Sequence, residues 1–128
     1  MKGSYVLLIK LPTEVAINIG SLGYVHFSRG WYAYIGSAMG GLKSRVTRHL
    51  RKDKKLHWHI DYLLRLASIK KVFMNESETR KECRIAGILV NYFDYVPGFC
   101  CSDCSCKSHL FYSRHKQEMI PKINEALR

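Results

Sequence analysis

Gly36–Ser44 is a glycine-rich segment between an aromatic run and a helical pattern, a setting in which backbone N–H groups can bind phosphate. It falls short of a P-loop, because Leu42 separates the second glycine from Lys43, and a P-loop lysine follows that glycine directly. The segment therefore excludes a P-loop NTPase. It keeps a helix N-terminus with a basic flank, which could hold a phosphodiester.

Arg45 and His49 are four residues apart and share one side of the helix expected over residues 42–50. They lie beside its apolar stripe of Leu42, Val46 and Leu50. An arginine at the edge of a buried face can present a fixed fork to a phosphate oxygen. The alternative for Arg45 is a side chain whose stem packs on the protein while its charge reaches solvent.

Glu82 is the most informative acid, because at about 100° per residue it lies in line with Ala86, Leu89 and Phe93 on the apolar face of its helix. A carboxylate that faces inward needs a partner. The functional partner would be Mg²⁺ or Mn²⁺, which take one or two carboxylates and complete their shell with water and phosphate. The structural alternative places Glu82 in the first turn of a helix capped by Thr79. Both interpretations stay open.

Four of the five cysteines lie within residues 100–106, and His109 follows. Such a crowded, odd set makes a poor disulfide framework, so we expect reduced thiols or a metal site. A structural Cys₃His zinc site would use Cys101, Cys104, Cys106 and His109. Zinc sites commonly draw ligand pairs from two separated loops, so plain reduced thiols in a turn are the favoured alternative.

His57, His59 and Asp61 could also be metal ligands, but residues at i and i+2 do not share a helix face. We expect a structural role instead, in which Asp61 or a backbone group orients one imidazole.

Basic residues are concentrated in the middle of the chain. Residues 41–71 hold ten of the 21 lysines and arginines but two of the ten acids, and the net charge is +11. Such a concentration opposes folding and typically serves to bind phosphate, so we expect nucleic acid as the partner, with a merely solvated basic face as the alternative. The expected nucleic-acid contacts are Lys43, Arg48, Arg51, Lys52, Lys54 and Lys55. Of these we interpret Arg48, Arg51 and Lys52 as mobile surface charges suited to loose contact with the backbone.

The remaining patterns predict one α+β domain over residues 1–128, with a small antiparallel or mixed sheet flanked by helices. Strands are expected over 5–11, 24–27, 31–35, 69–73 and 110–112, the first of them central and the second and third joined as a hairpin. Helices are expected over 42–50, 58–66, from a cap at 75 or 79 to about 93, and over 118–127. Residues 98–128 then comprise a cysteine-rich loop and a short terminal helix.

Composition narrows the class of protein. With 47% hydrophobic and 24% charged residues, the chain has the composition of a folded protein and not of a disordered one. At 128 residues it is too short for two full domains. The longest apolar stretch near the start, Tyr5–Ile9, is far shorter than the roughly 20 residues that span a bilayer. We therefore expect no membrane association, and a cytoplasmic location.

Five short motifs within residues 3–112 carry a resemblance to a known family. In chain order they are Gly3-Ser4-Tyr5, Tyr34-Ile35-Gly36, Arg45 with His49, His57-Trp58-His59-Ile60-Asp61, and Ser102–His109. Together they resemble the GIY-YIG nuclease superfamily and, more closely, its small Uri-like branch, in which an insertion separates the two tyrosine motifs.

The resemblance implies a fold in which both tyrosines face a metal held by one glutamate, with a helix arginine on the scissile phosphate. The residues carried over are Tyr5, Tyr34, Arg45 and His49 for catalysis and Glu82 for the metal, with Glu78 as the fallback ligand. A phenol, with a reference pKa of about 10, is a poor base at neutral pH, so Tyr5 would need the metal or a neighbour to activate it.

The function we expect from these residues is a metal-dependent endonuclease that hydrolyses DNA with one Mg²⁺ or Mn²⁺ ion, in repair or processing. A non-catalytic nucleic-acid binding module of the same fold is the alternative, and RNA stays open as a substrate. A zinc- or thiol-centred regulatory protein ranks last.

Overall fold

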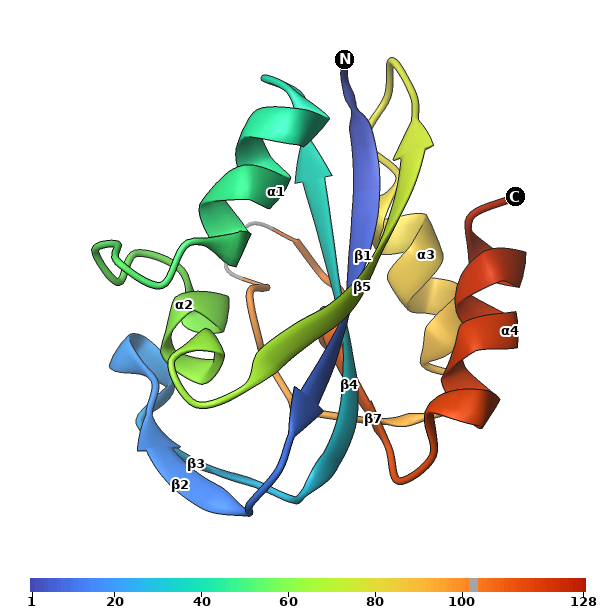
Figure 1. Ribbon diagram of the computed structural model, residues 1–128. Coiled ribbons are helices and arrows are strands. Elements are labelled where there is room, and N and C mark those ends of the chain that lie inside the picture. Colours follow the sequence, from blue (N-terminus) through green and yellow to red (C-terminus); the bar gives the residue numbers. More distant parts are fainter. Residues whose placement is uncertain (102–103) are drawn as a thin grey trace.

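The computed structural model, which describes residues 1–101 and 104–128, places a five-stranded antiparallel sheet at the centre of the molecule (Figure 1). Its strands are β1 (Gly3–Leu11), β4 (Gly30–Ala38), β5 (Ser68–Glu76), β6 (Asp94–Tyr95) and β7 (Leu110–Ser113). They lie in the order β5-β1-β4-β7-β6, and each neighbouring pair is antiparallel. The expected α+β class and the central place of the first strand are confirmed.

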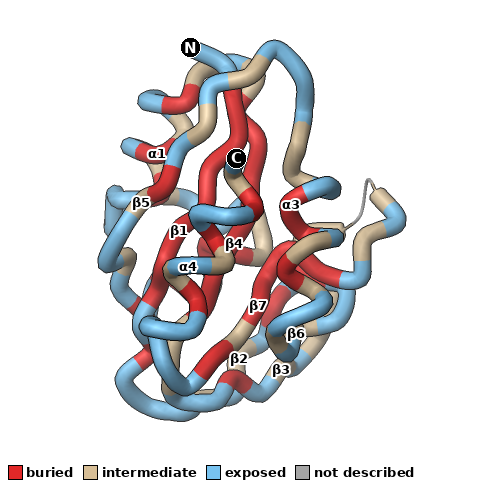
Figure 2. The backbone as a smooth tube through the Cα atoms, turned by 90° about the vertical axis from the view of Figure 1, so that its right-hand side faces the viewer, coloured by how far each residue is buried: buried red, intermediate tan, exposed pale blue. Residues whose placement is uncertain are grey.

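β1 is buried on both faces, which divides the core into two halves. Successive side chains of a strand point to opposite faces, so Tyr5 and Leu7 pack on one side of the sheet while Val6 and Leu8 pack on the other. Figure 2 shows β1 and β4 as a largely buried centre, with exposed segments around it. The continuous apolar run of β1 is therefore what a strand covered on both faces requires.

Helices cover both faces of the sheet (Figure 1). On one face lie α1 (Leu42–Leu50) and α2 (His59–Leu64), and on the other lie α3 (Glu82–Leu89) and α4 (Lys116–Ala126). All but α3 begin and end within two residues of the expected boundaries. No helix among the described residues is both long and apolar enough to cross a membrane.

The expected hairpin between residues 24–27 and 31–35 is wrong. β3 (Tyr24–Phe27) pairs instead with β2 (Val15–Asn18) in a separate two-stranded sheet, while β4 pairs with β1 from Leu11↔Gly30 to Gly3↔Ala38. The nine-residue match between β1 and β4 offers far more buried pairing than a short hairpin could. Residues 12–29 therefore lie outside the main sheet, and the chain re-enters this sheet with β4.

α3 is shorter than expected, because β5 extends further than its apolar run. β5 stays paired with β1 as far as Gly3↔Glu76, so Asn75 lies in a strand and cannot cap a helix. The N-cap of α3 is Lys81, which makes no side-chain capping bond, and neither expected capping box forms. Strand pairing has overridden the local capping signal.

Candidate active site

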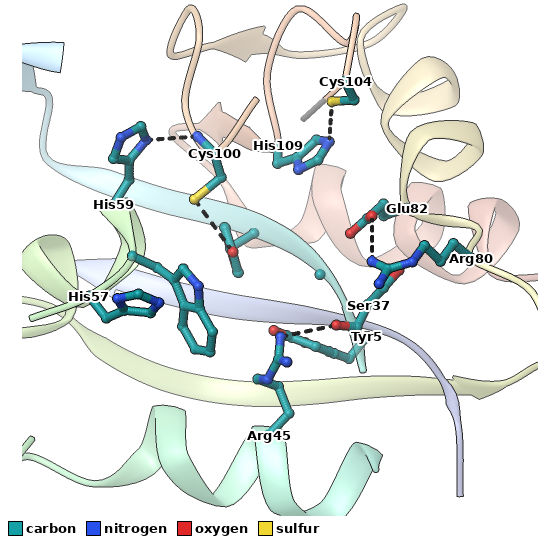
Figure 3. Close-up of a pocket in the computed structure, with 13 residues that line it drawn as sticks. Tyr5, Ser37, Arg45, His57, His59, Arg80, Glu82, Cys100, Cys104 and His109 are labelled. Atoms are coloured by element: carbon teal, nitrogen blue, oxygen red, sulfur yellow. Dashed lines mark hydrogen bonds and ion pairs between the residues drawn. The ribbon is translucent and has the colours of Figure 1, made fainter. Parts of the chain in front are cut away.

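A cavity of about 330 Å³ lies where β1, β4, α1 and the start of α3 meet. Of the five residues carried over from the family resemblance, four line it, namely Tyr5, Tyr34, Arg45 and Glu82. The candidate zinc ligands Cys104 and His109 line it as well. Figure 3 shows Arg45 pointing from α1 toward Tyr5 and Ser37, with Glu82 and Arg80 at the side of the cavity nearest α3. Tyr5 and Glu82, which are 77 positions apart in the chain, thus share one small space.

Tyr5 is held deep in the cavity wall. Its ring is 1% exposed, and its hydroxyl lies 2.7 Å from Nε2 of His49. A Cβ atom at Gly36, which pairs with Tyr5 across β1 and β4, would collide with the phenol ring, so a glycine is required there. Burial raises the pKa of Tyr5 although Arg45 opposes the shift, and the phenol is therefore protonated at neutral pH. Tyr5 then donates its proton to the bond with His49.

His49 is buried on the inner face of α1 in the place expected for Leu50, which is 53% exposed. Burial lowers the pKa of His49 to about 4, so the ring is neutral at pH 7 and its Nε2 can accept from Tyr5. In that tautomer Nδ1 carries the hydrogen, and this atom has no partner among the described residues. His49 is thus a neutral base in contact with the phenol.

Arg45 is fixed in place. Its guanidinium lies 4.5 Å from the centre of the Trp58 ring and donates from Nη1 to the carbonyl oxygen of Ser37 at 3.1 Å. These contacts leave other N–H groups of the fork facing the cavity that Arg45 lines. The structure therefore favours a held guanidinium over a side chain that reaches into solvent.

Glu82 is the first residue of α3, and its side chain is 22% exposed in the cavity wall. Its Oε1 lies 3.6 Å from Nη1 of Arg80. Glu78, the fallback ligand, is 89% exposed, pairs with Lys2 and does not line the cavity. Among the described lining residues Glu82 is the one carboxylate, which fits Mg²⁺ or Mn²⁺, since these ions fill their other positions with water and phosphate.

Tyr34 lies beside Tyr5, with ring centres 6.4 Å apart. Its hydroxyl donates to Sγ of Cys100 at 3.5 Å, and burial raises its pKa. Cys100 in turn donates its backbone N–H to Nδ1 of His59 at 2.9 Å. A backbone N–H therefore orients one imidazole of the histidine-rich stretch, as expected from the sequence.

The expectation that Arg48 is a mobile surface charge is wrong. Both Nη atoms of Arg48 donate to the carboxylate of Asp61, at 3.0 and 2.9 Å, and its guanidinium stacks 4.2 Å from the Trp58 ring centre. Asp61 is fully buried and also accepts the backbone N–H groups of His57 and Trp58. Burial works against the charged carboxylate, but Arg48 and these two bonds outweigh it and lower the pKa of Asp61.

Two of the expected phosphate-binding lysines also have internal partners. Lys54 donates to backbone carbonyl oxygens at the end of α1, the nearest being that of Arg51 at 2.7 Å, and Lys52 donates to the carbonyl oxygen of Leu64 at 3.1 Å. A lysine at a helix C-terminus satisfies carbonyl groups that the helix leaves unpaired. Lys43, Arg51 and Lys55 are exposed.

Of the four zinc ligands considered from the sequence, Cys101 is wrong, because the cluster in the structure contains Cys83 in its place. The potential ligand atoms of Cys83, Cys104, Cys106 and His109 all lie within 4.8 Å of one another, whereas the Cys101 thiol bonds to the carbonyl oxygen of Phe99. Cys83 comes from α3, directly after Glu82. It is the one cysteine of the five outside residues 100–106, and a separated cysteine of this kind is the signal that could have included it. Ser102 and Asp103, the first two residues of the motif that ends at His109, lie outside the described residues.

We expect His49 to make stability depend on pH between about 4 and 6.5. In the unfolded chain a histidine takes up a proton near pH 6.5, whereas folded His49 resists it until about pH 4. The unfolded state therefore binds more protons in this window, and stability falls as the pH falls, by about 3 kcal/mol at about 1.36 kcal/mol per pKa unit.

Urea denaturation across this range checks the effect. His49→Gln should flatten the pH dependence relative to the unaltered protein, while His57→Gln, which changes an exposed ring, should preserve it. An unchanged pH profile in His49→Gln would contradict the assignment of a buried neutral ring.

Comparison with known families gives one match. Residues 4–128 match the family model described as Domain of unknown function DUF123. No curated protein and no solved structure matches the chain.

Proposed function

This chain belongs to the DUF123 family, and we propose that it is a metal-dependent endonuclease of the GIY-YIG type, Uri-like in its motifs, that hydrolyses phosphodiester bonds in DNA. The observation that carries the proposal is the convergence of Tyr5, Arg45 and Glu82 on one cavity from three different elements. A phenol, a guanidinium and a carboxylate are the groups needed for proton transfer, phosphate binding and metal binding. A core that only had to pack would have no need for this combination.

Arg45 is the candidate phosphate ligand. Its contacts with Trp58 and Ser37 fix the guanidinium before substrate arrives, so little reorganisation accompanies binding. A planar fork can bond two phosphate oxygens at once and stabilise the charge that develops on them as phosphorus is attacked. Arg45 therefore serves as the anion-stabilising group of the reaction.

Tyr5 and His49 form the proton-transfer pair. The raised pKa of the phenol makes it an ineffective base alone at neutral pH, but His49 already lies 2.7 Å from its hydroxyl and is neutral. Tyr5 can accept a proton from the attacking water while its own proton moves to Nε2 of His49. Glu82 would hold Mg²⁺ or Mn²⁺, which would supply positive charge near the phosphate oxygens and lower the pKa of water.

The exposed basic residues around α1 support a nucleic-acid partner. Lys43, Arg51 and Lys55 can contact the DNA backbone, and the net charge of +11 favours association with any polyanion. Such contacts report phosphate rather than base identity, so they are compatible with DNA or RNA. They position the substrate, while Arg45 and Glu82 act at the scissile bond.

The test is cleavage of supercoiled plasmid, single-stranded DNA and a branched duplex in the presence of Mg²⁺, Mn²⁺ or EDTA. We expect cutting that requires the metal, and a loss of about 10²–10³-fold in rate for Arg45→Ala, the magnitude associated with removal of one anion-stabilising donor. Arg29→Ala is the matched control, since it removes an exposed arginine that neither lines the cavity nor belongs to the expected DNA contacts.

Two outcomes would contradict the proposal. Equal rates for the Arg45 and Arg29 variants would remove Arg45 from the mechanism. No cutting on any substrate, combined with tight binding that weakens steeply with salt, would favour the non-catalytic binding module.

A further inference from the structure

Cys83, Cys104, Cys106 and His109 form a cluster, called here the cysteine–histidine cluster, at the edge of the cavity. The four potential ligand atoms lie within 4.8 Å of one another, and Sγ of Cys104 lies 3.5 Å from Nε2 of His109 (Figure 3). In a tetrahedral zinc site with bonds of about 2.0–2.3 Å, neighbouring ligand atoms are about 3.3–3.8 Å apart. The cluster therefore needs only a small contraction to reach that geometry.

The ligands come from two segments that are separate in the chain. Cys83 lies in the first turn of α3, whereas the other three belong to the segment that leads into β7. Structural zinc sites typically combine ligands from two such segments. The objection to a zinc site within residues 101–109 alone was that all its ligands came from one short segment. The fold removes this objection, because it brings Cys83 to the cluster from α3.

His109 is well placed as a rigid ligand. It is 5% exposed, its backbone N–H donates to the carbonyl oxygen of Phe99 at 3.1 Å, and its own carbonyl oxygen accepts from the N–H of Ile35 at 3.0 Å. These two bonds fix the backbone against β4 and against Phe99, so the imidazole is presented to the cluster without a further loss of chain entropy.

We propose that the cysteine–histidine cluster binds one Zn²⁺ ion through three sulfur atoms and Nε2 of His109. Three sulfur ligands and an imidazole select a thiophilic ion over Mg²⁺ or Mn²⁺, which prefer oxygen. Binding displaces the three thiol protons to solvent. With four protein ligands the ion has no open position, so its role is structural.

The ion ties the segment before β7 to the first turn of α3. This tie matters because Lys81, the N-cap of α3, makes no side-chain capping bond. Zinc therefore braces the helix start that carries Glu82. The site stands on its own geometry and does not depend on the proposed nuclease activity.

Zinc content of protein purified without added metal tests the site. We expect one zinc per chain in the unaltered protein and in Cys101→Ser, and in Cys83→Ser an affinity at least about 100-fold weaker in competition with a chelating dye, since loss of a direct ligand exceeds the usual effect of losing a supporting group. Full zinc in Cys83→Ser, loss of zinc in Cys101→Ser, or iron in place of zinc would overturn the assignment.

A second measurement uses the unaltered chain and so does not depend on a variant that folds. Iodoacetamide is added to zinc-loaded and to EDTA-stripped protein, and the labelled cysteines are identified by mass spectrometry. Cys83, whose side chain is exposed, should be protected by zinc and labelled after stripping, whereas Cys101 should react to the same extent in both samples. Equal labelling of Cys83 in the two samples would overturn the site.

Discussion

Replacing Glu82 by alanine should reduce metal-dependent DNA cleavage by about a thousandfold or more. Glu82 is the one carboxylate among the described residues that line the cavity, so no neighbouring acid can take its place as the metal ligand. Metal ions contribute several kcal/mol to stabilisation of the transition state, and about 1.36 kcal/mol corresponds to a factor of ten. The rate is measured under single-turnover conditions with saturating enzyme, so that a change in DNA affinity does not enter.

Glu78→Ala is the matched control, because it removes an exposed glutamate four residues earlier that pairs with Lys2 outside the cavity. This variant should cut at the rate of the unaltered protein. DNA affinity of Glu82→Ala should be unchanged or slightly higher, since a negative charge is lost beside a phosphate site. Cleavage by Glu82→Ala at the full rate would exclude this residue as the metal ligand.

Glu82 adjoins Cys83 in the chain, so the zinc content of Glu82→Ala must be measured on the same sample. A variant that keeps its zinc but loses cleavage separates the catalytic metal from the structural one. The nuclease proposal and the zinc proposal can then fail independently.

Replacing Asp61 by alanine should lower the free energy of unfolding by about 3–5 kcal/mol, the usual cost of removing one partner of a buried ion pair. Asp61 is fully buried and accepts both Nη atoms of Arg48 together with the backbone N–H groups of His57 and Trp58. Its removal leaves a guanidinium and two N–H groups without their acceptor at once.

Guanidinium chloride denaturation gives the difference directly. Asp53→Ala, which removes an exposed aspartate in the same connection between α1 and α2, should change stability by no more than about 0.5 kcal/mol. If Asp61→Ala lowers the free energy of unfolding by less than about 1 kcal/mol, the Asp61 carboxylate does not hold the connection between α1 and α2 in place. In the Asp61 variant Trp58, on whose ring Arg45 stacks, also loses the acceptor of its backbone N–H.

Local patterns in the sequence predicted the types of most elements. The period of residues 42–50 gave α1 its full extent, and the apolar run from Tyr5 marked a strand buried on both faces. These signals are local, because they reflect the repeat of a helix or strand along its own residues. The candidate residues Tyr5, Tyr34, Arg45 and Glu82 also came from the sequence, through motifs that resemble a known family, and the fold brings them to one cavity.

The sequence did not indicate which distant side chains contact one another in the fold. Nothing in residues 45–51 distinguishes Arg48 from its exposed neighbours, yet the approach of α2 gives it Asp61, 13 residues away, as a buried partner. The same limit explains the choice of Cys83 over Cys101, since only the packing of α3 against the segment before β7 brings Cys83 to His109.

The sequence by itself therefore determined where most of the chain is helical or extended, that it is strongly basic, and which residue types could act on a phosphodiester. The tertiary structure alone decided which charges are free, which thiols meet, and that His49 lies against Tyr5 from 44 positions away. The physical reason is that periodicity and turn propensity act between neighbours in the chain, whereas burial, ion pairing and ligand geometry depend on which distant segments pack together.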